Sequence, residues 1–476
     1  MKIVYKTGFM LMSCVLLFSC KKTLDINVDP NNFPNVPASL SLPPAQVQLA
    51  YTLGGDISRI TGNFTQHYAG HRNQPLEYNQ YDVNPATSDG LWSSLYAVVL
   101  RDLQAVQDTS RKVGDSIYIG ISQILTAHTY HVLTDLFGDI PFSETMQGVN
   151  NITPKYDRQE DIYPALISMI DAGVANVTSG LGNEPGNDDL IYGGDVEMWE
   201  RYGNSLKLRL LNHLSKRQPN AAAEFLNTNP VLISSNEQNA MVTFGSSSSN
   251  ANPVYGFDEL SGRFDMAVST TIVGKLQQLN DPRIDQYFFP VLNNGKGRKG
   301  QYFGNEPGGD DDDAGQNLFS RIGPAYASIN SPVMLLSYAE VQFIIAEIRL
   351  REGKNAEAAT AYNNAIRADF DYLGIGSSAN AYLAKSEVAF NNTLQRLMEQ
   401  KWITMFQAPY ESWTDWRRTG FPALSPAIVN RTNDVIPRKL PHPQLEVNLN
   451  RASLEEGPGV PVPIESLKQR VWWDAP

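Results

Sequence analysis

The chain contains 476 residues and carries a formal net charge of −12 at pH 7. This length is sufficient for one large domain, or for two or three fused domains, with a sizeable hydrophobic core. The acidic balance argues against a nucleic-acid partner and against binding of acidic lipid headgroups through the folded body, because both would repel a negatively charged surface.

The amino terminus has the charge pattern of an export signal. Lys2 and Lys6 form a short basic lead, and the apolar run FMLMSCVLLF follows at residues 9–18. A membrane-spanning helix needs about 20 apolar residues, so this run is too short to be one. Residues 1–19 are therefore predicted to be a signal peptide.

Cys20 is the predicted site of lipid attachment. Its surroundings resemble the bacterial lipobox, with Leu17 three residues before the cysteine and the small Ser19 directly before it. Acyl chains bury methylene groups at about 0.8 kcal/mol each, so several chains would hold the protein on a membrane permanently. A plain secretory signal that is cleaved elsewhere is the alternative. Cys14, the only other cysteine, lies in the segment to be removed, so no disulfide is expected.

The segment after the anchor changes from irregular to helical character. Residues 21–44, KKTLDINVDPNNFPNVPASLSLPP, are rich in Pro and Asn and predict a tether and an arm that cannot hold a helix. Beyond it, apolar residues recur at spacings of three and four, which is typical of helices. The predicted helices occupy residues 45–70, 91–109, 116–139, 156–177 and 196–217.

The clearest helical pair is predicted at residues 331–374, with its turn at residues 352–354. Small residues that face across a hairpin let two helix backbones approach, which is the packing logic of tetratricopeptide repeats. The residues in these positions are Ala339, Phe343 and Ala346 on the first helix and Ala358, Ala361, Tyr362 and Ala365 on the second. The predicted fold is therefore mainly α, with tetratricopeptide-like hairpins that support an irregular, loop-rich ligand-binding region.

Two long segments lack this helical periodicity. Residues 229–330 are rich in Gly, Asn, Ser and Asp, and residues 421–476 are rich in Pro. Long ordered loops on a rigid scaffold are where binding usually resides. The predicted organisation is an anchor and arm at 20–42, a helical part at 43–228, a ligand-binding region at 229–330, helical hairpins at 331–420 and an irregular region at 421–476, all in one domain.

Five segments carry a resemblance to a known family. They are CKKTLDINVDPNN at residues 20–32, TDLFGDIPFSE at 134–144, WERYGNSLKLRLLNHL at 199–214, SYAEVQFIIAE at 337–347 and QKWITMFQAPYESWTDWRRTGFP at 400–422. By their order and spacing, the chain resembles the SusD/RagB family of nutrient-binding outer-membrane lipoproteins, and more narrowly its second SusD-like branch.

The resemblance implies a non-catalytic protein that captures a glycan or a peptide outside the cell. It also implies a partner, a TonB-dependent outer-membrane barrel of the SusC/RagA type, on which such proteins sit as a lid. The expected location is the outer membrane, with the lipid anchor at Cys20 and the body facing the cell exterior. No cofactor, no catalytic residue and no metal ligand is expected.

Two other functions remain open at this point. A structural subunit of another outer-membrane machine would have the same fold but would bind protein rather than a nutrient. A surface glycoside hydrolase would need two carboxylates about 5 to 10 Å apart. The 50 acidic residues allow such a pair, but the sequence has no nucleophile elbow, Gly-rich phosphate loop or metal motif, which disfavours catalysis.

Three loops combine aromatic and polar side chains, as sugar binding requires. A sugar packs its CH face on an aromatic ring, and a hydroxyl group buried without a partner costs about 1 to 3 kcal/mol. The loops lie at residues 71–85, 252–264 and 297–313. The predicted ligand-binding residues are the aromatics Tyr78, Tyr81, Tyr255, Phe257, Tyr302 and Phe303 and the polar Asn79, Asp258 and Asn305. Packing within the loops is the alternative role of each.

The acidic run Asp310 to Asp313 is a weak calcium candidate. It does not fit an EF-hand loop, because the fifth position is Ala314 and the twelfth is Arg321. A solvated loop is the prediction.

The histidines fall into two pairs with helical spacing, His67 with His71 and His128 with His131. Each pair could share one face of a helix. Neither has a third ligand nearby in the sequence, so no metal site is predicted.

Two further motifs are predicted to be structural. The indoles and guanidinium groups of SWTDWRRTGFP indicate a brace rather than a ligand site, because guanidinium groups stack on indoles and bind carboxylates or helix-end carbonyls. Its members are Trp413, Trp416, Arg417 and Arg418. Asp135 and Asp139, which flank Phe137 and Gly138, are predicted to serve turn and cap chemistry.

Overall fold

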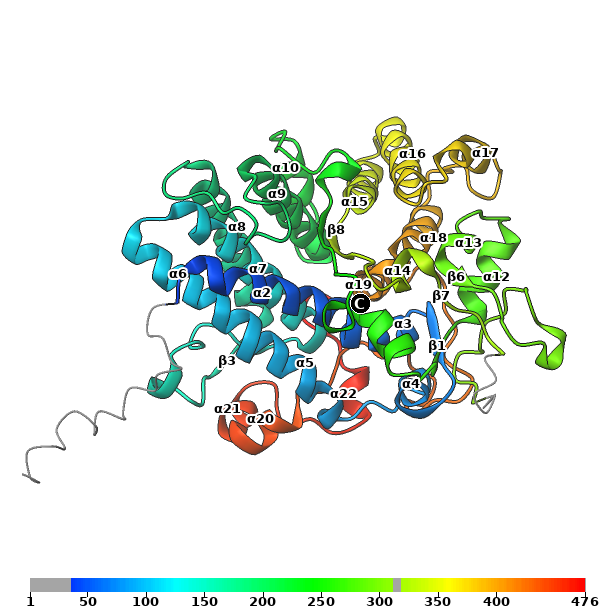
Figure 1. Ribbon diagram of the computed structural model, residues 1–476, viewed down its shortest axis with the longest axis horizontal. Coiled ribbons are helices and arrows are strands. Elements are labelled where there is room, and N and C mark those ends of the chain that lie inside the picture. Colours follow the sequence, from blue (N-terminus) through cyan, green and yellow to red (C-terminus); the bar gives the residue numbers. More distant parts are fainter. Residues whose placement is uncertain (1–35, 311–317, 476) are drawn as a thin grey trace, which may run out of the picture. The chain divides into compact units, whose positions relative to one another are not determined.

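The computed structural model describes residues 36–310 and 318–475. From Ala38 onward these residues are mainly helical, and their strands are two to four residues long, which confirms the predicted mainly α class (Figure 1). Cys20, the predicted signal peptide and Asp311 to Asp313 lie outside the described residues. Among the described helices, none has the length and apolar character that a membrane span requires.

Helix α2 (Ala38–Thr52) occupies part of the predicted non-helical arm, so that prediction is wrong. The helix contains Pro43 and Pro44, and an interior proline costs about 3 kcal/mol or more. Leu42 and Leu49 are completely buried and Ala45 nearly so. Each fully buried leucine contributes about 1.5 to 3 kcal/mol, so tertiary packing offsets the local cost.

The helix continues beyond α2 but ends earlier than predicted. A π-helical turn η1 (Leu53–Ile57) leads into α3 (Ser58–Phe64). Residues 68–70, which the periodicity assigned to the same helix, form strand β1 (Tyr68–Gly70).

Four long helices follow one another as packed neighbours, as the sequence predicts: α6 (Arg101–Val113), α7 (Ser116–Phe137), α8 (Gln159–Thr178) and α9 (Val196–His213) (Figure 1). Helices α7 and α8 approach closely at two glycines. A Cβ atom at Gly120 would lie 2.5 Å from the Gly173 carbonyl oxygen, so a larger residue would push the helices apart. Helix α7 ends at its C-cap Gly138, as expected.

The predicted hairpin at residues 331–374 is confirmed. It consists of α15 (Tyr338–Arg351) and α16 (Asn355–Tyr372), joined by a turn in which Gly353 has φ +75°. All seven residues that were expected to face across the hairpin are buried. The small side chains therefore set the approach of the two helices, and Phe343 and Tyr362 fill the groove between them at a centroid distance of 6.0 Å.

The strands of the described residues form four antiparallel pairs, and the first and third of these join segments far apart in the sequence. The pairs are β1 with β5 (Met266–Val268), β2 (Ile140–Pro141) with β3 (Tyr156–Asp157), β4 (Ala240–Val242) with β8 (Val333–Leu336), and β6 (Phe288–Phe289) with β7 (Arg321–Ile322).

Shorter helices fill the segments between these elements. Up to Tyr287 they are α4 (Asn73–Asn79), α5 (Asp89–Ser93), the π-helical η3 (Ser94–Leu100), α10 (Ala221–Leu226), α11 (Pro253–Tyr255), the π-helical η8 (Gly256–Leu260), α12 (Thr270–Gln278) and α13 (Ile284–Tyr287). Beyond Tyr287 they are α14 (Pro324–Ala327), α17 (Ala379–Leu383), α18 (Leu394–Thr404), α19 (Pro409–Thr419), α20 (Gln444–Leu449), α21 (Arg451–Glu456) and α22 (Glu465–Lys468). Single 3-10 turns cover residues 85–88, 148–150, 214–216, 236–238, 248–250, 295–297, 376–378 and 405–407.

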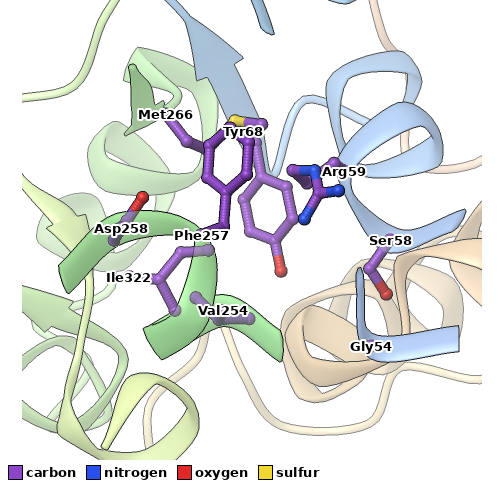
Figure 2. A pocket seen from close by; sticks show the side chains of 9 residues that line it. All are labelled: Gly54, Ser58, Arg59, Tyr68, Val254, Phe257, Asp258, Met266 and Ile322. Atoms are coloured by element: carbon purple, nitrogen blue, oxygen red, sulfur yellow. The ribbon is translucent and has the colours of Figure 1, made fainter. Parts of the chain in front are cut away.

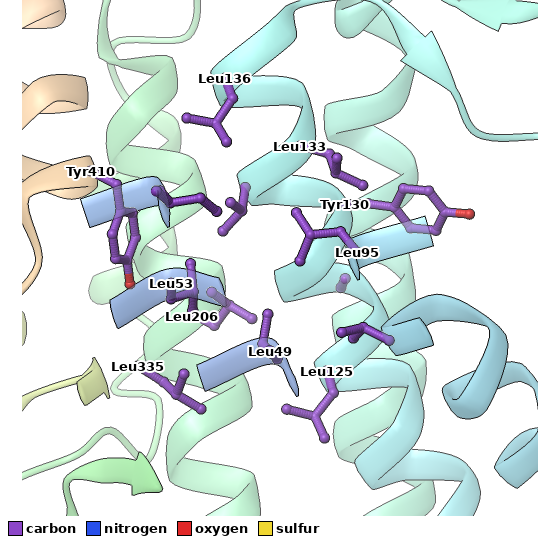
Figure 3. Close-up of a cluster of buried hydrophobic side chains, with 14 of the residues drawn as sticks. Leu49, Leu53, Leu95, Leu125, Tyr130, Leu133, Leu136, Leu206, Leu335 and Tyr410 are labelled. Atoms are coloured by element: carbon purple, nitrogen blue, oxygen red, sulfur yellow. The ribbon is translucent and has the colours of Figure 1, made fainter. Parts of the chain in front are cut away.

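The central helix of the core is α2. Figure 3 shows Leu49 and Leu53 of the α2–η1 segment packed among Leu125 and Leu133 of α7 and Leu206 of α9. All five side chains are at most 1% exposed. Helix α2 thus packs against α6 and α7 and against the strands β4 and β8, which ties the first described helix to segments far along the chain.

The predicted brace is confirmed in α19. The Trp413 indole donates to the Pro437 carbonyl oxygen at 2.7 Å, and the Arg417 guanidinium lies 3.7 Å from the centre of that indole. Arg418 donates to Glu347 Oε2 at 2.6 Å in a fully buried ion pair. These three side chains contact other parts of the protein, as a structural brace requires.

The two aspartates of TDLFGD have different roles. Asp139 is a cap, as predicted, since its Oδ1 accepts from the Gln159 amide at 2.9 Å where α8 begins. Asp135 is not, because its carboxylate is buried in a polar cluster with Tyr163 and Trp473, which lie far away in the sequence. The prediction of turn chemistry is wrong for Asp135.

Candidate ligand-binding face

The three loops that were predicted to bind ligand lie next to one another in the structure. Strand β1, which ends just before the first loop, pairs with β5, which begins just after the second. The His71 amide donates to the Asp265 carbonyl oxygen at 3.1 Å, and the Asn305 amide of the third loop donates to the Val268 carbonyl oxygen at 2.9 Å. We call residues 71–85, 252–264 and 297–310 the three-loop face.

Two of the predicted polar residues hold these loops together. Asn79 Nδ2 donates to the carbonyl oxygens of Gly70 at 2.9 Å and Glu306 at 3.2 Å. Asn305 Nδ2 donates to the Gly309 carbonyl oxygen at 3.1 Å. Both side chains are buried, so the contacts that the structure shows for them are internal to the face. Their contact with a ligand stays a prediction.

Tyr78 and Tyr81 also face the interior. They are 3% and 0% exposed. Tyr81 accepts a hydrogen bond at its hydroxyl oxygen from the Ala427 amide at 3.2 Å, and its ring packs edge-on against Phe64. The two tyrosines therefore pack in the interior, under the loops. Their direct stacking on a ligand stays a prediction.

Phe257 lies between two guanidinium groups. The Arg59 and Arg263 guanidinium carbons are 4.3 and 4.6 Å from the centre of its ring. Figure 2 shows this ring beside a small cavity that is lined by the segment around Gly54 to Tyr68 and by the segment around Val254 to Met266. The cavity has a volume of about 10 Å³, which is space for one water molecule and not for a sugar ring. A larger ligand must therefore lie on the open side of the face.

Asp258 borders the same cavity and is buried. Its Oδ1 accepts no hydrogen bond from the described residues, and its Oδ2 lies 3.9 Å from an Arg321 Nη1 atom. Burial raises the pKa of Asp258 to about 7, although the Arg321 guanidinium acts in the opposite direction. Near neutral pH this carboxyl group can therefore exchange a proton, which makes it a donor or an acceptor toward the cavity.

The remaining predicted aromatics are partly exposed. Tyr255, Tyr302 and Phe303 each reach the surface with part of the ring. The Tyr302 hydroxyl donates to Asp285 Oδ1 at 2.7 Å. The Arg298 guanidinium covers Phe303 at 3.5 Å from the ring centre. These side chains offer flat apolar surface next to hydrogen-bond donors and acceptors.

Sequence reasoning did not identify the arginines of this face. Arg59, Arg263, Arg298 and Arg321 each lie over an aromatic ring, the last over Phe264 at 4.4 Å. Arg263, Arg298 and Phe264 stand in or beside the predicted loops, so their position in the sequence was a usable signal. Arg59 lies in helix α3, and nothing local indicates that it reaches the loops.

The structure has larger hollows elsewhere. Two grooves of about 450 and 490 Å³ run along α16 and share Asn364 in their lining; we call them the α16 groove. Its only aromatic lining residue among the described residues is Tyr338. A third hollow of about 300 Å³ lies between α6, α7 and the segment after β2, with Tyr130 and Phe142 in its wall.

The first histidine pair does not lie on a helix. His67 follows α3 and His71 follows β1, so the predicted helical pair is wrong. His67 Nε2 bonds the Trp402 carbonyl oxygen at 2.8 Å, and its ring stacks on the Trp402 indole. Burial lowers the pKa of His67 to about 3, so this residue is a neutral member of the core.

A family model for SusD-like proteins, described as "Starch-binding associating with outer membrane", matches residues 30–443. The chain belongs to this SusD-like family. The family description places its members in association with the outer membrane. A search of curated proteins finds no match.

Solved structures of SusD-like proteins share the fold. One is named a chitin-binding protein, with a TM-score of 0.77 and 25% identity over 92% of this chain and 100% of that chain. A chitin-binding SusD homologue from Flavobacterium johnsoniae has a TM-score of 0.78 and 24% identity over 92% of this chain and 98% of that one. A SusD/RagB family protein from Bacteroides thetaiotaomicron has a TM-score of 0.78 and 22% identity over 92% and 99% of the two chains.

Proposed function

We propose that this SusD-like protein captures a glycan on the three-loop face and does not alter it chemically. Membership of a family described as starch-binding supports the ligand class, as do similar structures that are named chitin-binding. The observation that carries the proposal is the convergence of three distant loops into one face with partly exposed aromatic rings and adjacent guanidinium groups.

The chemistry of the face suits an extended oligosaccharide. Partly exposed rings such as Tyr255 and Phe303 can pack on the CH faces of sugar units, and arginine and amide groups can donate to their hydroxyl groups. The cavity beside Phe257 holds no more than a water molecule, so no sugar unit is enclosed. A surface contact of this kind gives micromolar to millimolar affinity, or about −4 to −8 kcal/mol, which permits release.

The residues proposed to contact the glycan directly are fewer than the ligand-binding residues predicted from the sequence. Tyr255, Phe257, Tyr302 and Phe303 are proposed to contact the glycan directly, because part of each ring is exposed. Asp258 is proposed to act on the glycan through the small cavity beside Phe257, which it borders. The four buried residues are proposed to hold the loops in position.

Release into a transporter completes the proposed role. A lipid chain on Cys20 would hold the protein on the outer membrane, and a TonB-dependent barrel of the SusC/RagA type would take up the captured glycan. The family description, which names association with the outer membrane, supports the location. A tagged chain that carries its native anchor should co-purify with a large barrel protein from solubilised outer membranes. Recovery of the chain alone would contradict the transporter partnership and leave glycan capture to be judged separately.

Calorimetric titration tests the ligand proposal. Chitin oligosaccharides and malto-oligosaccharides are titrated into the native protein and into the variants Tyr255→Ala and Phe303→Ala. Loss of one stacking ring is expected to weaken binding about tenfold. The matched control is Tyr338→Ala, which removes a partly exposed tyrosine from the α16 groove and should leave affinity unchanged. If Tyr255→Ala and Phe303→Ala both bind with native affinity and Tyr338→Ala binds more weakly, the glycan site lies in the α16 groove.

A further inference from the structure

A buried cluster of two histidines and one aspartate lies between helices α7 and α9. His131 and Asp135 are one turn apart on α7, and His213 is the last residue of α9. Their side chains are 1%, 6% and 2% exposed. A third ligand for the His128–His131 pair was not predictable from spacing, because His213 lies 82 residues after His131. We call His131, Asp135 and His213 the His–Asp–His cluster.

Three potential ligand atoms form a nearly equilateral triangle. His131 Nε2 lies 3.1 Å from Asp135 Oδ2 and 3.2 Å from His213 Nδ1, and the third side, from His213 Nδ1 to Asp135 Oδ2, is 3.2 Å. Zinc binds histidine nitrogen and carboxylate oxygen at about 2.0 to 2.2 Å, which places neighbouring ligand atoms of a tetrahedron about 3.3 Å apart. We propose that this cluster is a structural site for a divalent transition-metal cation of the zinc class.

The hydrogen bonds of Asp135 support this assignment. Its Oδ1 accepts from the Tyr163 hydroxyl at 2.6 Å and from the Trp473 indole at 2.7 Å. Its Oδ2 accepts no aligned hydrogen bond from the described residues, although two ring nitrogens lie within 3.2 Å of it. One oxygen is thus fixed by two donors, and the other is left pointing into the triangle, as a metal-ligating carboxylate requires.

His213 has the outer partner that metal-bound histidines usually have. Its Nε2 lies 3.1 Å from Glu411 Oε2, while Nδ1 faces the triangle. A carboxylate on the far nitrogen fixes the tautomer and makes the near nitrogen a better ligand. Glu411 is in turn 3.5 Å from Arg209, which also binds Glu340 Oε2 at 2.6 Å. The cluster is therefore supported by a second layer of charged groups.

The surroundings favour positive charge at this place. Two carboxylates lie beside the two imidazoles: Asp135 Oδ2 is 3.2 Å from His213 Nδ1, and Glu411 Oε2 is 3.1 Å from His213 Nε2. Their negative charge would offset that of a divalent cation at the centre of the triangle, where one ion can contact all three ligand atoms.

The bound metal would cross-link helices of the scaffold. The ligands join α7 to α9, and Tyr163 and Trp473 tie α8 and the C-terminal segment to the same carboxylate. Because the cluster is buried, the metal would be taken up during folding, and its binding energy would add to the stability of the folded state. Removal should lower the melting temperature without changing the three-loop face.

Metal analysis of the full mature chain tests the proposal. The protein is unfolded in urea, refolded with excess Zn²⁺, dialysed and analysed by mass spectrometry for zinc, and Co²⁺ is used in parallel for its visible absorption bands. About one equivalent of tightly held metal per chain is expected, and a strong chelator should lower Tm. Zinc below about one tenth of an equivalent, with Tm unchanged by chelator, would overturn the proposal.

Three variants locate the metal. Asp135→Asn and His213→Gln preserve side-chain size and are expected to lose the bound metal and the cobalt bands. His128→Gln is the matched control, because His128 is a fully buried histidine of the same helix that contacts Tyr202 and lies outside the triangle. Retention of metal by His213→Gln, or equal loss in His128→Gln, would overturn the assignment. If a ligand variant does not fold, the zinc content and chelator response of the native chain decide.

Discussion

The ion-paired arginines of the helical scaffold and the arginines at the three-loop face have different surroundings. In the scaffold, Arg209 and Arg418 are buried and paired with the carboxylates of Glu340 and Glu347. On the face, Arg298 lies over Phe303 near the surface, and Arg59 beside the face lies over Phe257 and also pairs with Asp56. The carboxylate offsets the desolvation of a buried guanidinium, whereas a guanidinium in contact with water can cover a ring and still donate outward. The same residue type thus fixes the scaffold and equips the face.

The largest expected effect is the loss of a buried partner in the scaffold. Arg209→Met removes the cation that faces Glu340 and Glu411 and leaves buried carboxylates without it. The free energy of unfolding should fall by about 3 to 5 kcal/mol, as measured by urea denaturation. Arg101→Ala, which breaks the exposed Arg101–Asp102 pair, is the control and should cost less than about 1 kcal/mol. If both variants lost a similar free energy of unfolding, burial would not distinguish the buried ion pairs from the exposed one.

An intermediate effect is expected at the border between the two regions, at Asp258. Burial raises its pKa from 3.8 to about 7, so the folded protein holds a proton that the unfolded chain has released. The contribution of Asp258 to stability, taken as the difference from Asp258→Asn, should therefore fall as pH rises from about 4 to about 7 and stay lower above that range. Asp258→Asn is neutral throughout and should be more stable than the native protein at about pH 8 by about 2 to 4 kcal/mol. Parallel stability curves against pH would show that Asp258 does not titrate in this range.

The smallest effect is expected for an arginine of the face. Arg298→Ala removes the guanidinium over Phe303 but breaks no buried ion pair among the described residues. Stability should change by no more than about 1 kcal/mol, and glycan affinity should fall about two- to fivefold. Calorimetry and urea denaturation on the same preparation separate the two quantities. A large loss of stability with unchanged affinity would place Arg298 with the scaffold arginines.

The helices were predictable because their signals are local. The hairpin α15–α16 and the end of α7 at Gly138 follow from apolar periodicity and from residues next to them in the chain. The part of α2 before residue 45 was missed, since Pro43 and Pro44 are unfavourable locally and only burial against distant segments offsets their cost. Local sequence patterns do not contain this contribution of tertiary packing to stability.

The candidate sites were predictable only in part, for the same reason. The composition of the three loops identified them as ligand-binding candidates, but it did not show which of their side chains face inward. Asn79 and Asn305 look like ligand donors in the sequence, whereas in the structure they bond carbonyl oxygens of the loops. The His–Asp–His cluster depends on His213, which the chain brings to α7 from another helix. Only the folded arrangement contains these contacts.

Hydrogen exchange with and without an oligosaccharide tests most directly where the ligand binds. The native protein is labelled in D₂O with a saturating chitin or malto-oligosaccharide, and exchange is read in peptides along the chain. Slower exchange is expected in the peptides that cover residues 71–85, 252–264 and 297–310, with no change in α15 and α16. Protection confined to α15 and α16 would contradict the assignment of glycan capture to the three-loop face.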